Sequence, residues 1–192
     1  MAFYSILFAI LFLGAFREVI RAFGASDWPT LWMAATLSMA IFNDVLYTSH
    51  YVEEKKAPYS IAMKLNDIVS FFLLGAAILV LQPGKDNIFE ASPGPWVKSL
   101  PRERVFWGLL TAYWLTVISW NLFGSFYSGA HVPIVIHLVI LLGFAAVLAA
   151  SFLPYPTVQA NAPWVAFAVF TLYAFILKPF VLRDMGPTIA KP

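Results

Sequence analysis

The 192-residue sequence contains no cysteine. This absence excludes disulfide bonds, thiolate metal ligands and cysteine nucleophiles. Charge is also scarce, because only 11% of the residues are Asp, Glu, Lys or Arg, whereas soluble domains average about 25%. The formal net charge is +2 and the basic residues are scattered along the chain, so we expect no nucleic-acid partner.

Several motifs of enzymes and metalloproteins are missing as well. The sequence has no HExxH, no GxSxG, no glycine-rich phosphate loop and no two histidines four residues apart. A metal site would need ligands from three separate segments, so we predict none. The residues identify no cofactor, no catalytic group and no known family.

Apolar residues are what the chain has in excess. Hydrophobic residues make up 61% of the sequence and aromatic residues 17%. A water-soluble fold of this length could not bury so much apolar surface. We therefore predict an all-α integral membrane protein, with residues 1–192 forming a single transmembrane domain in the lipid bilayer.

Six segments are long enough to cross a hydrocarbon core, which needs about 20 apolar residues. They predict a six-transmembrane-helix bundle with short loops and one longer 82–102 connection. The expected helices lie near 3–22, 28–52, 58–81, 103–125, 131–152 and 162–182. Asp27 and Asn161, the latter followed by Pro163, indicate the starts of the second and sixth helices. We expect the first helix to be retained, not cleaved as a signal peptide.

With six spans, both termini lie on one side of the membrane, here called side X, and the opposite side is Y. The expected Y loops hold six basic residues, and the X loops hold four with Lys178 at the border. Because cytoplasmic loops are enriched in Lys and Arg, we expect the termini of this multi-pass protein to be non-cytoplasmic. Arg17, Glu18 and Arg21 of the first helix must lie at an interface or be paired inside the bundle.

An Asn-Asp pair occurs in two neighbouring apolar segments, as Asn43–Asp44 and as Asn66–Asp67. Asp44 lies eight residues before the expected end of its helix, and Asp67 nine residues after the start of the next. At a rise of 1.5 Å per residue, both carboxylates are roughly 12–14 Å below side X. We therefore expect them to meet inside the bundle near the middle of the bilayer.

Further polar residues fall in the same X half of the expected helices. The candidate ligand- or ion-binding residues are Asn43, Asp44, Tyr47, His50, Lys64, Asn66, Asp67, Asn121, His137 and Lys178. Their one-sided distribution predicts a polar cavity that opens on side X. Within it, Asp67 would pair with Lys64, and Asp44 with Lys178 or a histidine.

Structural roles compete with these assignments. Asn43 and Asn66 could instead link helices through hydrogen bonds, and Lys64, Lys178 and His50 could extend to the membrane interface. Small residues around Gly143, at 145, 146, 149 and 150, predict close helix packing, including a homo-oligomer contact.

The polar cluster leads to one functional hypothesis and three alternatives. The first is a small transporter or channel that moves a proton, a cation or a small polar solute past Asp44 and Asp67, with His137 or His50 as a titrating gate. The alternatives are a module that binds or senses a hydrophobic small molecule, an intramembrane enzyme acting on a lipid-like substrate, and a subunit of a larger complex.

Overall fold

The computed structural model describes residues 2–55, 61–82, 101–128 and 134–177, with side chains described over 6–45, 61–82, 101–122 and 137–175. Apart from short turns, this part of the chain is helical, which confirms the all-α fold. The elements are α1 (Ala2–Gly24), α2 (Trp28–Lys55), α3 (Ile61–Leu81), α5 (Arg102–Ser128), α6 (Ile134–Ala150), α7 (Pro156–Leu172) and the π-helical turn η2 (Tyr173–Leu177). The expected 82–102 connection lies outside the described residues, apart from its ends.

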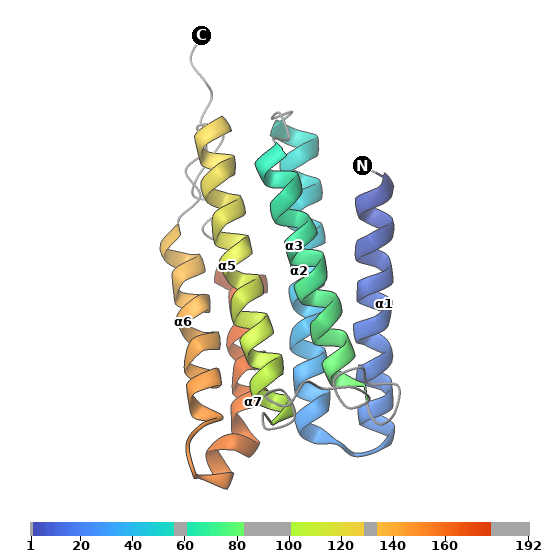
Figure 1. Ribbon diagram of the computed structural model, residues 1–192, viewed down its shortest axis with the longest axis vertical. Coiled ribbons are helices and arrows are strands. Elements are labelled where there is room, and N and C mark those ends of the chain that lie inside the picture. Colours follow the sequence, from blue (N-terminus) through green and yellow to red (C-terminus); the bar gives the residue numbers. More distant parts are fainter. Residues whose placement is uncertain (1, 56–60, 83–100, 129–133, 178–192) are drawn as a thin grey trace, which may run out of the picture.

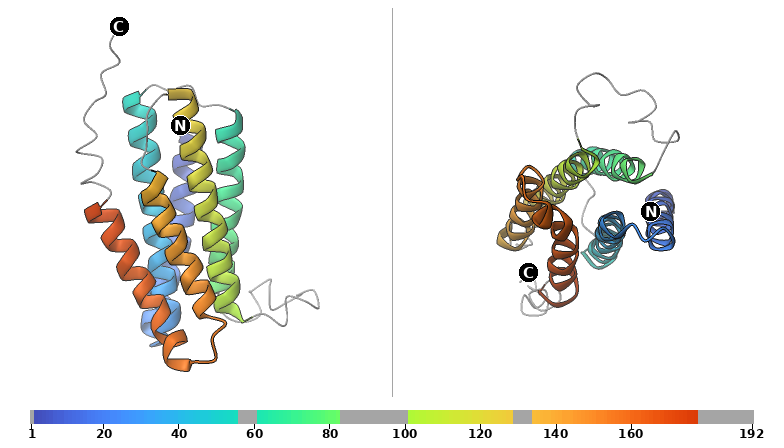
Figure 2. Two further views of the ribbon diagram at one scale, coloured as in Figure 1. Left: turned by 90° about the vertical axis from the view of Figure 1, so that its left-hand side faces the viewer. Right: turned by 90° about the horizontal axis from the view of Figure 1, so that it is seen from below.

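Successive helices run in opposite directions along one common axis (Figure 1). Viewed down this axis, they form a closed ring in the order α1, α3, α5, α6, α7 and α2 (Figure 2). Helix α2 also contacts α3 and α5 across the ring. The end where α1 passes into α2 is called end Y below, and the opposite end is called end X.

Three helical segments are long and apolar enough to cross a membrane, and they span Ile61–Leu81, Arg102–Leu122 and Pro156–Phe175. The outer surface of the bundle is also apolar. Ile10, Leu13, Phe72 and Leu142 are among its exposed side chains, and Phe72 is 76% exposed. Large exposed apolar surfaces are unfavourable in water, whereas lipid tails accept them.

The buried residues of each helix recur at intervals of three and four, so each helix turns one stripe toward the interior. On α3 this stripe includes Met63, Ser70, Leu74, Ala77 and Leu81. On α5 it includes Phe106, Leu110 and Tyr113. These stripes form one continuous core that is rich in aromatic rings near its centre.

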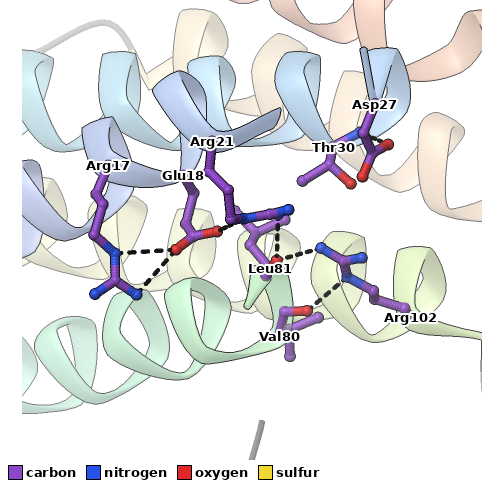
Figure 3. A network of polar contacts seen from close by, with 8 residues as sticks. All are labelled: Arg17, Glu18, Arg21, Asp27, Thr30, Val80, Leu81 and Arg102. Carbon is purple, nitrogen blue, oxygen red and sulfur yellow. Dashed lines mark hydrogen bonds and ion pairs between the residues drawn. The ribbon is translucent and has the colours of Figure 1, made fainter. Parts of the chain in front are cut away.

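A buried carboxylate near the end of α1 holds two arginines of the same helix (Figure 3). The Glu18 side chain is fully buried, and it accepts a hydrogen bond from Nε of Arg21 at 2.6 Å and one from Nη2 of Arg17 at 3.1 Å. Arg21 is mostly buried, whereas Arg17 is 68% exposed. Glu18 and Arg21 therefore pair inside the bundle. This is one of the two arrangements expected for this charged segment, the other being a position at the membrane interface.

Arg21 of α1 and Arg102 of α5 tie their helices to the last turn of α3 (Figure 3). Arg21 donates to the carbonyl of Leu81 at 3.1 Å, and Arg102 donates to the carbonyls of Leu81 and, at 2.7 Å, Val80. The last carbonyls of a helix lack partners within it, and cations nearby also stabilise the negative end of its dipole. The arginines thus fix end Y of the bundle.

The sequence identifies the start of α2 correctly and the start of α7 incorrectly. Oδ1 of Asp27 accepts a hydrogen bond from the N–H of Thr30 at 3.3 Å, as a helix cap does. Helix α7, however, begins at Pro156, and Pro163 lies inside it, so the start expected at 162 is wrong. Of two prolines seven residues apart, the first begins the helix, and Asn161 bonds within the helix instead of capping it.

Candidate functional site

Both aspartates lie on the buried stripes of their helices. Asp44 continues the stripe of α2, which contains Met33, Leu37 and Ala40. Asp67 lies between the buried residues Met63 and Ser70 on α3. Because these spacings are three and four residues, each carboxylate is directed toward the interior and not toward the outer surface.

The structure brings the two carboxylates together beside a tyrosine of α5. Asp44 and Asp67 lie within electrostatic range of each other and of the Tyr113 hydroxyl. Tyr113 is 1% exposed and sits in the core next to Trp114. Helices α2, α3 and α5 thus contribute one acidic or phenolic group each to a single interior cluster.

The Tyr113 hydroxyl has an unusual position for a buried polar group. It interacts with Asp44, but no partner among the described residues meets full hydrogen-bond geometry with it. Leaving a buried polar group in this state costs about 1–3 kcal/mol. The hydroxyl and the Asp44 carboxylate therefore belong to one polar cluster within the core.

A second pair of titratable groups also packs against Trp114. The hydroxyl of Tyr173 is 3.3 Å from Nδ1 of His137, and both side chains are buried. Trp114 fixes the backbone of α6 here by donating from Nε1 to the carbonyl of His137 at 2.9 Å. Tyr173 is also the first residue of the π-helical turn η2, a type of turn that recurs at functional sites.

Trp114 is the centre of an aromatic cluster that joins the two pairs. Five rings surround it, with centroid distances from 5.4 to 6.1 Å: Tyr113, His137, Phe144, Phe170 and Tyr173. Most of these contacts are edge-to-face, which is favourable for aromatic rings. The cluster holds both tyrosines in defined orientations within an otherwise apolar core.

The titratable residues of the cluster all lie well away from end Y. Counted from the end-Y terminus of each helix, Asp44, Asp67, Tyr113, His137 and Tyr173 lie roughly 17–26 Å along it at 1.5 Å per residue. Charged and titratable residues at end Y, such as Glu18, belong to the separate arginine network.

Asn66 links two helices through hydrogen bonds, the structural role that the sequence analysis gave as the alternative to ligand binding. Its amide nitrogen donates to the carbonyl of Thr116 at 2.9 Å, and its Oδ1 accepts from the hydroxyl of Ser119 at 2.5 Å. One turn away, the hydroxyls of Ser70 and Thr116 are 2.6 Å apart. Together these bonds link α3 to α5 beside Asp67.

The expected ion pair between Lys64 and Asp67 does not form. Lys64 is exposed, and the two ion pairs that join described side chains to each other both involve Glu18. Although three residues apart on one helix, the two side chains diverge, since the carboxylate faces the core and the long lysine stem reaches outward.

The remaining predicted residues are less informative. Asn43 is half-buried beside Asp44 on α2, and Asn121 is buried and donates to the carbonyl of Val117 in its own helix. Tyr47 and His50 lie on α2, but their side chains are outside the described set, and Lys178 is outside the described residues altogether.

Sequence reasoning missed Tyr113 and Tyr173. Their signal was the spacing on their helices, because Tyr113 follows Phe106 and Leu110 by steps of four and three, and Tyr173 follows Ala166 and Phe170 likewise. No group of three His, Cys, Asp or Glu side chains that could hold a metal ion occurs in the part of the chain that is described. The carboxyl, phenol and imidazole groups of the cluster can each donate or accept a proton.

Compared with known proteins, the chain matches no family model, no curated protein and no solved structure.

Proposed function

We propose that this protein is a small membrane transporter or channel in which a proton or small cation passes through the site formed by Asp44 and Asp67. The observation that carries the proposal is the interaction of these two carboxylates beside Tyr113, inside a bundle whose outer surface is apolar. Acidic side chains at such depth are costly in a membrane and mark transport pathways more often than structural contacts.

The membrane arrangement belongs to the same proposal. Beyond the three segments that are both long and apolar enough by themselves, α1, α2 and α6 pack beside them in antiparallel order, so we propose that all six cross the bilayer. In α1, the charges that would oppose insertion are gathered at end Y, where Glu18 and Arg21 neutralise each other. Both ends of the chain are then on the X side.

The energetics of Asp67 favour a functional role over a structural one. It contributes no ion pair within the described residues, and the nearby link between α3 and α5 is made by Asn66 and Ser70 instead. A leucine at this position would pack into the same stripe without the cost of a buried carboxylate. The carboxylate is best explained by what it binds.

The test is ion flux into liposomes that contain the purified protein. Asp44→Asn and Asp67→Asn remove the charge and keep the side-chain size, so we expect each to lower the flux strongly. Asp27→Asn is the matched control, because Asp27 caps α2 at end Y and asparagine caps helices equally well. Wild-type flux in both site variants would rule out the proposed pathway.

A groove on the outside of the bundle favours a second candidate, the binding of a hydrophobic small molecule. It lies between α6 and α7, has a volume of about 400 Å³, and is lined by apolar residues that include Gly143, Ala146, Val165 and Val169. A tail-like apolar molecule fits such a surface. Retention of one defined apolar molecule by the purified protein, together with no ion flux, would favour this candidate.

A further inference from the structure

We infer that the arginine network at end Y binds an anionic phosphate group, carried either by a lipid headgroup or by a soluble phosphate. The site is separate from the Asp44–Asp67 cluster, goes beyond the proposed function and does not rest on it. Its main residues are Arg21 and Arg102, which reach the last turn of α3 from two other helices (Figure 3).

Two positively charged side chains share one neutral acceptor in this network. Arg21 of α1 and Arg102 of α5 both donate to the carbonyl of Leu81. Because hydrogen-bond distances are about 3 Å, the two donor nitrogens lie within about 6 Å of each other. Like charges this close repel each other. The negative end of the α3 dipole, about half an elementary charge, offsets only part of that repulsion.

The network also holds more positive than negative charge. It contains Arg17, Arg21 and Arg102 but a single carboxylate, that of Glu18 (Figure 3). Both arginines of α1 already bond to this carboxylate. Three guanidinium groups are therefore matched by one acidic side chain.

Neighbouring acidic residues do not supply the missing counter-charge. Asp27 accepts a hydrogen bond from the N–H of Thr30 at the start of α2. Glu103 follows Arg102 on α5, but its side chain is exposed. Neither acid forms an ion pair with a described side chain. Within the described part of the chain, the counter-charge is thus incomplete, and a bound anion would complete it.

The arginines also retain hydrogen-bond donors for such an anion. Arg21 uses Nε for Glu18 and Nη2 for Leu81. Arg102 uses Nε for Val80 and Nη2 for Leu81. A guanidinium has five N–H groups, so more than half of the donors of each arginine have no acceptor among the described residues. Both side chains are partly exposed, and the planar guanidinium fork matches phosphate oxygens.

A phospholipid is one source of this group. In the membrane arrangement proposed above, end Y lies at the level of the headgroups, where basic pockets between helices bind anionic lipids. Leu13, Phe16 and Ile20 are exposed on α1 beside Arg17, and they offer apolar surface to the acyl chains of the same lipid. A soluble phosphate would use the arginines alone.

The experiment titrates the purified protein, in micelles of a neutral detergent, with phosphatidylglycerol, with phosphatidylcholine and with inorganic phosphate alone. Native mass spectrometry counts the bound molecules. We expect one phosphatidylglycerol to bind per chain, and Arg102→Gln to weaken this binding about tenfold or more. Arg104→Gln is the matched control and should bind as the wild type does. It removes the same charge from α5, but Arg104 bonds to the carbonyl of Ser151 and contacts the ring of Phe152 instead.

The three titrations also identify the source of the phosphate. Binding of phosphatidylglycerol that depends on Arg102, without binding of inorganic phosphate, would assign the site to a lipid headgroup. Binding of inorganic phosphate that depends on Arg102 would assign it to a soluble ligand. Binding that is unchanged in Arg102→Gln, equally weakened in Arg104→Gln, or equally strong for the neutral phosphatidylcholine would overturn the inference.

Folding of the variants is tested separately, because Arg102→Gln removes bonds to the last turn of α3. Arg102→Lys keeps the charge but loses the guanidinium fork, so it should remain folded and bind phosphatidylglycerol about three- to tenfold more weakly. Full binding in a folded Arg102→Lys variant would contradict the site. Ion flux through the Asp44–Asp67 cluster is measured independently, so failure of the phosphate site leaves the proposed function standing.

Discussion

The hydroxyl of Ser119 on α5 donates a 2.5 Å hydrogen bond to Oδ1 of Asn66 on α3. The Asn66 amide returns a bond to the carbonyl of Thr116 at 2.9 Å, so the asparagine side chain spans the two helices with both of its polar atoms. The residue next to it, Asp67, takes no part in this link. Of the Asn-Asp pair on α3, one member therefore holds the helices together, and the other is left to the interior site.

Replacing Asn66 should weaken the contact between α3 and α5. Interhelical hydrogen bonds in membranes contribute about 0.6 kcal/mol on average and up to about 1.7 kcal/mol, so we expect Asn66→Ala to lower the unfolding free energy by about 1 kcal/mol. Asn161→Ala is the matched control, because Asn161 is exposed and bonds within α7. Unfolding in mixed micelles measures both, and equal stabilities for the two variants would contradict the structural role of Asn66.

The two arginines that contact Glu18 should differ in their importance. Arg21 is mostly buried and also bonds to the carbonyl of Leu81, so Arg21→Ala should cost about 2 kcal/mol of unfolding free energy. Arg17 is largely exposed, and Arg17→Ala should cost about 0.5 kcal/mol. Measuring the two variants under identical micellar conditions compares them directly, and a larger loss for Arg17→Ala would show that end Y is assembled differently.

The outer face of α3 should contact lipid. Phe72 lies near the middle of the helix and is 76% exposed. Arginine at the centre of a membrane-spanning helix costs about 2.5–3.5 kcal/mol on insertion scales, so Phe72→Arg should sharply reduce the insertion of α3 in a membrane-insertion assay. Phe72→Leu is the control and should insert as the wild type does. Unchanged insertion of Phe72→Arg would mean that this face does not meet the hydrocarbon core.

The sequence predicts much of the architecture because that part depends on local patterns. Apolar runs separated by polar turns give the order and alternation of the helices, and Asp27 marks the start of α2 through its own side-chain bond. The depth of Asp44 and Asp67 follows from counting residues along each helix. These features need no knowledge of which helix packs against which.

The features that the sequence does not reveal depend on tertiary packing. Tyr113 and Tyr173 could equally have belonged to an aromatic belt at the membrane surface, and only the ring of helices shows that they flank Trp114. The π-helical turn at Tyr173 and the continuation of α7 through Pro163 likewise have no local signal strong enough to predict them. Lys64 does not pair with Asp67 because the two side chains point to different sides of α3, which the sequence alone does not show.

The account depends most on the meeting of Asp44 and Asp67, and the cysteine-free chain allows a direct measurement of it. Two double variants are compared in membranes with a short bifunctional thiol reagent: Asp44→Cys with Asp67→Cys, and Asp44→Cys with Ile68→Cys. Ile68 has nearly the same depth as Asp67 but is exposed on the outer face of α3. We expect efficient cross-linking of the first pair and little of the second, whereas preferential cross-linking through position 68 would place the carboxylates on different faces and contradict the shared site.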